Sequence, residues 1–390
     1  MKELVTLLAY GTYLFMGGIG SLNSLAILEM GETFQVDSGV ISYWLTLGSI
    51  GTTLAVYANG YLLSRIGPRQ IALTATACAA GGCLLVASAG SLLMLGEGIL
   101  LGGIGIGLMS SAANYLLVAT HNEEERTGKL MLVNFCYSLA AILTPLWAGW
   151  LLAKEWSWQP LYQGCLFFVV LWLVLARRLP KQPLPQAKQE DTGRQSWPMR
   201  VYLAGTIFVL YVIAEVTYFS WLVVYLREAA ALDVKSAGIA LSLFWACMAA
   251  GRLTSGLLGR WLPLRTYLAI SLLVAAFAYL GLLLAPGNRL ACFILTGLAG
   301  LACSGLYAAL LAFGTQQAEQ ATPSLISFFL GGGSIAGIVS GAFGGFLKQS
   351  GGVDACLALS AALLVVVLLL FGVARHLENV EQEEADALPS

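Results

Sequence analysis

The chain has 390 residues, of which 58% are hydrophobic and only 11% are charged. Soluble domains carry roughly 25% charged residues, so this composition excludes a soluble globular protein. The net charge of −1 provides no basic excess for nucleic acid and no acidic excess for a basic partner.

Twelve apolar runs follow one another along the chain, each with about 18 residues or more, enough to cross a bilayer as a helix. They cover residues 4–28, 40–63, 70–89, 92–120, 128–152, 158–178, 199–226, 236–259, 265–285, 289–318, 323–348 and 353–375. Lipid offers no hydrogen-bond partner to the backbone, so each crossing is expected to be helical. The first run is too long for a signal peptide and lacks an A-x-A cleavage pattern, so we interpret it as a retained span.

The cations are distributed unequally between the two sides of the membrane. With twelve spans, 15 of the 20 Lys and Arg residues fall on the side of the chain termini and 5 on the other side. Cytoplasmic loops carry the excess of Lys and Arg. The sequence therefore predicts a multi-pass protein of the bacterial cytoplasmic (inner) membrane with both termini in the cytoplasm.

Two segments are too polar to span the membrane. Residues 179–198 contain four prolines among Gln, Lys and Glu, which predicts a flexible cytoplasmic linker. Residues 376–390 are acidic, and we expect a solvated cytoplasmic tail without fixed structure. These segments divide the chain into an N-terminal six-helix half, residues 1–178, and a C-terminal six-helix half, residues 199–375.

The two halves are internal repeats related by an offset of 195 residues. Leu62, Leu63, Arg65 and Pro68 coincide with Leu257, Leu258, Arg260 and Pro263, and Gly102, Gly105, Ala113, Leu116 and Thr120 coincide with Gly297, Gly300, Ala308, Leu311 and Thr315. Because each half has an even number of spans, the pseudo-two-fold axis runs along the membrane normal. This arrangement places a substrate site between the halves and suits alternating access.

Nothing in the sequence indicates enzymatic or metal chemistry. The eight cysteines lie in apolar stretches, where a thiol acts as a small hydrophobe. There is no CxxC or HExxH motif, and His121 and His376 lie far from acidic or cysteine clusters. We expect no disulfide framework, no metal, no cofactor and no catalytic residue.

The segment GYLLSRIGPR, from Gly60 to Arg69, resembles the loop between spans two and three of major facilitator transporters. The usual acid is replaced by Ser64, and the repeat of this segment, from Gly256 to Arg265, lacks an acid as well. The resemblance implies a major facilitator fold of twelve transmembrane helices and a cytoplasmic gate that contains Arg65, Arg69 and Arg260. Arg252 is assigned to the same gate because an unpaired cation in the inner half of span eight is costly. A role of these cations in setting topology alone is the alternative.

The segments YVIAEVTYFSWLVVYL, from Tyr211, and FWACMAAGRLTSGLL, from Phe244, are similar to spans seven and eight of the fucose/glucose permease branch. GTQQAEQATPSLISFFLGGGSIAG, from Gly314, resembles TsgA-type bacterial members more closely. Proton-coupled fucose permeases carry acids at the positions of Ser24 and Ser110. That proton route is therefore absent here, while the neighbouring Asn23 and Asn114 remain available for hydrogen bonds.

Glu215 is the acid placed nearest the middle of a span. Lipid burial disfavours its charged form, so Glu215 is the candidate for proton coupling or for pairing with a cationic substrate. The predicted substrate-binding residues are Asn23, Asn114, Tyr211, Glu215, Tyr218, Trp221, Trp245 and Tyr307. For each of them a structural role in helix packing is the alternative.

These features predict a monomeric secondary active transporter that moves a small organic solute through alternating access. A sugar or sugar-like polyol is the favoured substrate, taken up by symport with H⁺ through Glu215. The alternative is a proton-coupled efflux antiporter for drugs or metabolites. Its support is TPLWAG, from Thr144 to Gly149, which resembles in part an antiporter element of span five.

Overall fold

The structure is a computed structural model, and it describes residues 1–180, 197–258, 262–318 and 323–387. The described part of the chain contains helices and no strand. The helices are α1 (Lys2–Phe34), α2 (Ser38–Ala87), α3 (Leu92–Thr120), α4 (Glu123–Leu152), α5 (Gln159–Gly164), α6 (Leu166–Ala176), α7 (Met199–Glu228), α8 (Val234–Leu258), α9 (Leu264–Leu284), α10 (Arg289–Cys303), α11 (Leu306–Thr315) and α12 (Pro323–Ala387). The predicted linker lies largely outside the described residues.

Helices α2 and α12 each contain two of the predicted spans. Gly67 interrupts α2 with φ 79° directly before Pro68, and Gly352 interrupts α12 with φ 76°. A positive φ is readily adopted only by glycine, so these two residues permit the chain to reverse. The first segment of α2 runs parallel to α3 and the second runs antiparallel to it, as the facing residues along α3 show.

Eleven helical stretches of the described chain are long and apolar enough to cross a membrane. The longest of them, Phe328–Glu378, has 51 residues and contains the break at Gly352, so it holds two spans. The predicted fold class, an all-α membrane protein with twelve spanning segments in two halves, is confirmed.

Two predicted continuous spans are interrupted. The span at 158–178 is divided into α5 and α6 at Cys165, and the span at 289–318 is divided into α10 and α11 at Ser304 and Gly305. At the second break, Ser304 Oγ donates to the Leu301 carbonyl at 2.7 Å, and Tyr211 donates to the Cys303 carbonyl at 3.3 Å. These side chains satisfy carbonyl groups near a break in the helical ladder.

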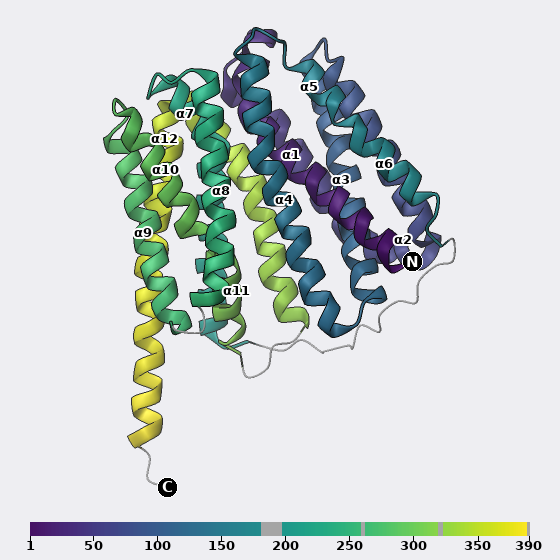
Figure 1. Cartoon of the computed structure of the whole chain (residues 1–390). Helices are drawn as coiled ribbons and strands as arrows, with labels where there is room; N and C mark the ends of the chain where they lie inside the picture. The colour runs from purple at the N-terminus through teal and green to yellow at the C-terminus, as the bar shows by residue number, and fades with distance from the viewer. Residues whose placement is uncertain (181–196, 259–261, 319–322, 388–390) are drawn as a thin grey trace.

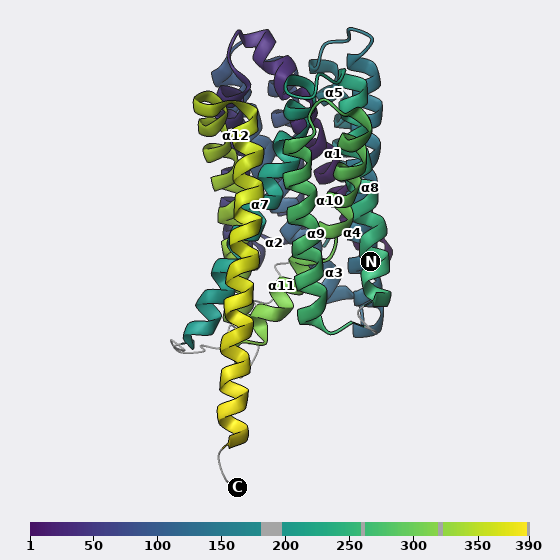
Figure 2. The same ribbon diagram turned by 90° about the vertical axis from the view of Figure 1, so that its left-hand side faces the viewer.

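The prediction of an unstructured tail after residue 375 is wrong for residues 376–387. Helix α12 continues to Ala387, and its last turns extend beyond the ends of the neighbouring helices (Figures 1 and 2). The segment is rich in Glu, Gln and Ala, which favour helix. Glu378 also fixes it, because its carboxylate accepts hydrogen bonds from Arg265 at 2.7 and 2.9 Å and from Gln317 at 2.7 Å.

The two halves meet mainly along two pairs of helices, and α1 also contacts α7. Helix α4 packs against α8, and α2 packs against the first segment of α12, residues 323–351. In Figure 1 the N-terminal half lies on the right and the C-terminal half on the left, with α4 and α8 side by side between them. At the α4–α8 contact, a Cβ on Gly238 would lie 2.6 Å from the Pro145 carbonyl oxygen. Glycine is required there because the two backbones approach so closely.

Candidate functional site

A cavity of about 350 Å³ lies between the halves. Most of its wall comes from α1 to α5 of the N-terminal half, and Gly333, Ser334 and Gly337 of α12 contribute the part from the C-terminal half. Small-molecule sites typically span roughly 300–1,000 Å³, so a small organic solute fits this volume. None of the described residues that line the cavity is charged.

Several polar groups in this cavity lack a protein partner. The Tyr162 hydroxyl donates to Asn23 Oδ1 at 2.5 Å, and this hydrogen bond orients the amide. Within the described structure, the Asn23 amide nitrogen and the hydroxyl groups of Ser49, Thr53 and Tyr137 have no hydrogen-bond partner. These groups provide hydrogen-bond donors and acceptors without a fixed charge. They suit a solute that carries several hydroxyl or carbonyl groups.

Glycines bring the helices around the cavity close together. A Cβ on Gly103 of α3 would lie 2.2 Å from the Gly48 carbonyl oxygen of α2, and a Cβ on Gly82 would lie 2.6 Å from the Gly102 nitrogen. Small residues at helix contacts allow such approach in membranes. The wall of the cavity is therefore backbone in many places, and its shape depends on glycine.

Glu215 lies beside this cavity rather than in its wall. The carboxyl is half-buried in α7 and lies within electrostatic range of Arg252 in α8 and of Tyr137, which lines the cavity. Arg252 Nη1 donates to Ser138 Oγ of α4 at 3.0 Å, and this hydrogen bond crosses from one half to the other. The acid, the cation and the cavity therefore meet at the α4–α8 contact.

Of the predicted binding residues, Asn23 alone is part of the cavity lining. Asn114 donates to the Tyr13 hydroxyl at 2.7 Å within the N-terminal half. Tyr218 is fully buried and stacks on Tyr279 with ring centroids 3.8 Å apart. Their surroundings are those of packing residues.

Trp245 and Tyr307 lie next to residues of the cavity wall, whereas Trp221 is buried within the C-terminal half. Trp245 packs edge-on against Tyr137 with centroids 5.6 Å apart, so it touches a residue of the cavity wall. Tyr307 is 38% exposed, and its hydroxyl is 3.5 Å from the point that a Cβ on Gly333 would occupy. Trp221 is buried against Gly344.

The predicted gate cations are separated in the structure. Arg65 lies over the Tyr61 ring at 4.3 Å within its own half, and Arg69 is half-buried on the second segment of α2. Among these cations, Arg252 is the one with a described hydrogen bond to the other half, to Ser138. Arg260 lies outside the described residues.

The serines at the positions of the family's acids bond to their own helices. Ser24 donates to the Gly20 carbonyl and Ser110 to the Gly107 carbonyl, each at 3.3 Å. The sequence reasoning missed Tyr137 and Tyr162, which lie in the neighbouring helices α4 and α5. It also missed the hydroxyl residues of α2, although their spacing of three and four residues indicates one helix face.

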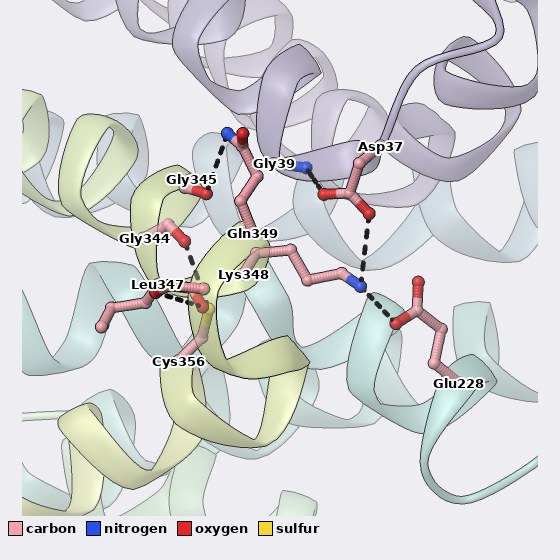
Figure 3. A network of polar contacts seen from close by, with 10 residues as sticks. Asp37, Gly39, Glu228, Gly344, Gly345, Leu347, Lys348, Gln349 and Cys356 are labelled. Atoms are coloured by element: carbon pink, nitrogen blue, oxygen red, sulfur yellow. Dashed lines mark hydrogen bonds and ion pairs between the residues drawn. The ribbon is translucent and has the colours of Figure 1, made fainter.

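At the end formed by the α1–α2 and α7–α8 connections, ionic contacts join the two halves. Lys348 Nζ of α12 lies 3.6 Å from Asp37 Oδ2 and 2.7 Å from Glu228 Oε2 (Figure 3). Arg227 of α7 also pairs with Glu29 of α1 across the two halves. We call this end of the molecule the Lys348 end.

At the opposite end, the ion pairs between described residues stay within one half. Lys2 contacts Glu125 at 2.8 Å in the N-terminal half, and Arg265 contacts Glu378 at 2.7 Å in the C-terminal half. The hydrogen bond from Lys2 holds the pKa of Glu125 below its ordinary value. Ionic contacts between the described parts of the two halves are therefore confined to the Lys348 end.

Comparison with known proteins gives a consistent result. The model of the Major Facilitator Superfamily matches residues 8–322 and 203–390. The chain is 22% identical over 369 residues to Protein TsgA homolog of Erwinia tasmaniensis, with 94% of this chain and 93% of that protein covered. It is also 22% identical over 375 residues to Protein TsgA of Salmonella typhi, with 94% and 93% covered.

Two solved structures have the same fold. The nucleoside transporter NupG aligns with a TM-score of 0.72 and 16% identity, over 96% of this chain and 99% of that one. A bacterial homolog of the human lysosomal transporter Spinster, in an inward-facing and occupied conformation, aligns with a TM-score of 0.73 and 14% identity, over 96% of both chains.

Proposed function

Since the chain belongs to the Major Facilitator Superfamily, whose members are secondary transporters, we propose that it moves a small, uncharged, hydroxyl-bearing organic solute by alternating access. A sugar or sugar-like polyol is the favoured class. The observation that carries this proposal is the cavity between the halves, with its uncharged wall and its unpartnered polar groups.

The lack of charge in the cavity wall supports a neutral solute. A charged solute that leaves water loses several kcal/mol of hydration or more unless a counter-charge receives it. The described lining offers amide, hydroxyl and backbone groups, which replace the water around hydroxyl groups at little cost. Hydrogen-bond recognition also discriminates well against analogues that lack the matching group.

We place the protein in the bacterial cytoplasmic membrane as a monomer with both termini in the cytoplasm. Support for this orientation comes from the 15 to 5 division of the cations. The Lys348 end is then the periplasmic end, and its ionic contacts close the cavity toward the periplasm. Symport with H⁺ through Glu215 is part of the proposal, because this acid lies beside the cavity and near Arg252.

Proton-coupled efflux is the second candidate. Glu215 would then receive a cationic solute from the cavity. The TPLWAG segment lies at the contact between the halves, where Pro145 and Gly149 approach Gly238. This location suits a role in the transport cycle of either kind, so the charge of the solute distinguishes the two candidates.

A thermal-shift screen of the purified protein tests the proposal. Sugars, polyols, nucleosides, amino acids and lipophilic cations are compared, since a ligand that binds only the native state raises the apparent stability. We expect a neutral hydroxylated hit whose affinity falls by about two- to tenfold in Asn23→Ala, as for one lost hydrogen bond of roughly 0.5–1.5 kcal/mol.

Thr206→Ala provides the matched control, because Thr206 is exposed on α7 and donates to the Tyr202 carbonyl, away from the cavity. This variant should bind like the parent. Hits confined to lipophilic cations, abolished by Glu215→Gln and unaffected by Asn23→Ala, would replace the proposal with efflux.

A further inference from the structure

The ionic network at the Lys348 end is separate from the cavity. The side chain of Lys348 is only 9% exposed, whereas Asp37 is 44% and Glu228 is 36% exposed. Asp37 belongs to the N-terminal half, and Glu228 belongs to the same half as Lys348. Lys348 therefore has one partner across the contact between the halves and one partner that moves with it (Figure 3).

The two carboxylate oxygens of Asp37 have different partners. Oδ1 accepts the Gly39 backbone N–H at 2.7 Å and caps the N-terminus of α2. Oδ2 is left to face Lys348. At the corresponding start of α8, Asp233 uses both oxygens on Ser236, at 2.9 and 2.7 Å, and these hydrogen bonds hold its pKa below the ordinary value. Of these two capping aspartates, Asp37 is the one whose described contacts include an ion pair with the other half.

The backbones beneath this network touch. A Cβ on Gly39 would lie 2.6 Å from the Gly345 carbonyl oxygen, and a Cβ on Gly345 would lie 2.6 Å from the Gly39 carbonyl oxygen. One turn further along, Ser42 Oγ donates to the Gly341 carbonyl at 2.8 Å, and Ser42 is 6% exposed. Any separation of the halves at this end breaks these contacts and exposes Ser42.

We propose that Lys348 is a reversible ionic lock that holds the Lys348 end closed. Separation of the halves breaks the Asp37 contact, but Lys348 keeps Glu228 as a partner. Leaving a poorly exposed cation without any partner is costly, whereas releasing a half-exposed carboxylate into water costs little. Asp37 therefore stabilises the closed state, and Glu228 makes opening easier.

The lock can be tested without knowledge of the solute. Ser42→Cys introduces a near-isosteric reporter, and its reaction rate with a membrane-impermeant maleimide measures the population with this end open. The protein without Ser42→Cys gives the blank for the native cysteines. Lys154→Met is the matched control, because Lys154 lies at the same end but over the Trp150 ring at 3.8 Å in its own half.

We expect slow labelling in the parent with the reporter and in Lys154→Met. Asp37→Asn keeps an N-cap residue of equal quality, so the fold is retained while the ion pair is lost. The labelling rate in Asp37→Asn and in Lys348→Met should rise by about three- to tenfold. This range lies between the effect of losing a fully exposed ion pair and that of losing a buried one, because the Lys348 pair is partly buried. The double variant should add little to either single change, since both remove the same contact.

Glu228→Gln should not raise the labelling rate, in contrast to Asp37→Asn. Without Glu228, opening leaves Lys348 with no ionic partner, so labelling should be equal to or slower than in the parent. Three results would overturn the lock: fast labelling in the parent, rates in Asp37→Asn equal to those in Lys154→Met, or a rise in Glu228→Gln as large as that in Asp37→Asn. These outcomes are independent of which solute the protein carries.

Discussion

Alanine substitution should destabilise the protein at Gly103 but not at the adjacent Gly102. A Cβ on Gly103 would lie 2.2 Å from the Gly48 carbonyl oxygen and 2.8 Å from Gly48 Cα, whereas a Cβ on Gly102 would meet nothing within 4 Å. The obstructing atoms at Gly103 are backbone atoms of α2, so they cannot move aside by rotation of a side chain. Helices α2 and α3 would have to separate.

The expected magnitudes follow from two opposing terms. Overpacking of a tight contact costs about 1–3 kcal/mol. Replacement of glycine by alanine inside a helix stabilises the helix by about 0.8–1 kcal/mol. Gly103→Ala should therefore lower the free energy of unfolding by up to about 2 kcal/mol. Gly102→Ala should leave it unchanged or raise it by up to about 1 kcal/mol.

Thermal unfolding of both variants in the same detergent checks this difference. Both glycines border the cavity, so an added methyl group alters the lining in either case, and the comparison isolates the contact with α2. Gly103→Ala should have the lower midpoint, with Gly102→Ala at or above the parent. Equal midpoints, or the reverse order, would refute the close approach of α2 and α3 at Gly48.

Glu215→Gln keeps size and hydrogen bonding, so it should preserve expression and downhill exchange in proteoliposomes while abolishing accumulation against a gradient; unchanged accumulation with the parent's pH dependence would make Glu215 structural. Reporter fusions at Gln186 and at the C-terminal end should both report cytoplasm, and a periplasmic signal from either would contradict the proposed topology. Gly238→Ala should slow exchange because its Cβ would lie 2.6 Å from the Pro145 carbonyl across the halves, whereas Gly372→Ala, with nothing within 4 Å and away from the cavity lining, should not.

The spans were predictable because the bilayer imposes a minimum length on every apolar run. The predicted span at 92–120 coincides with α3, and the reversal at Gly67 and Pro68 falls between two predicted spans. The break in the tenth span was not predictable from hydropathy. At this break, Tyr211 of α7 bonds to the Cys303 carbonyl, and the Tyr267 hydroxyl of α9 lies 2.1 Å from the position that a Cβ on Gly305 would occupy. Both residues belong to other helices, so hydropathy along the tenth span does not reveal them.

The candidate site was predictable only in part. Asn23 was predicted because it lies next to Ser24, the position of a family acid in span one, and the structure places it in the cavity. Tyr137 and Tyr162 carry no such signal, since a tyrosine in a span is as common in packing as in binding. Tyr218 illustrates this point, because it was predicted to bind the substrate but stacks on Tyr279 inside its own half.

The first segment of α12 connects the cavity to the Lys348 end. Ser334 lines the cavity, and Lys348 lies fourteen residues later on the same helical segment, a rise of about 21 Å at 1.5 Å per residue. A solute shifts a conformational equilibrium only through different affinities for the two states, and contact with α12 provides such a difference.

A solute that raises the thermal stability should therefore also change the labelling rate of Ser42→Cys. Ser334→Ala should reduce that change, whereas Ser350→Ala, which removes an exposed hydroxyl bonded to the Phe346 carbonyl beyond Lys348, should not. If the solute binds and the labelling rate stays constant, occupation of the cavity is not transmitted through α12 to the Lys348 end.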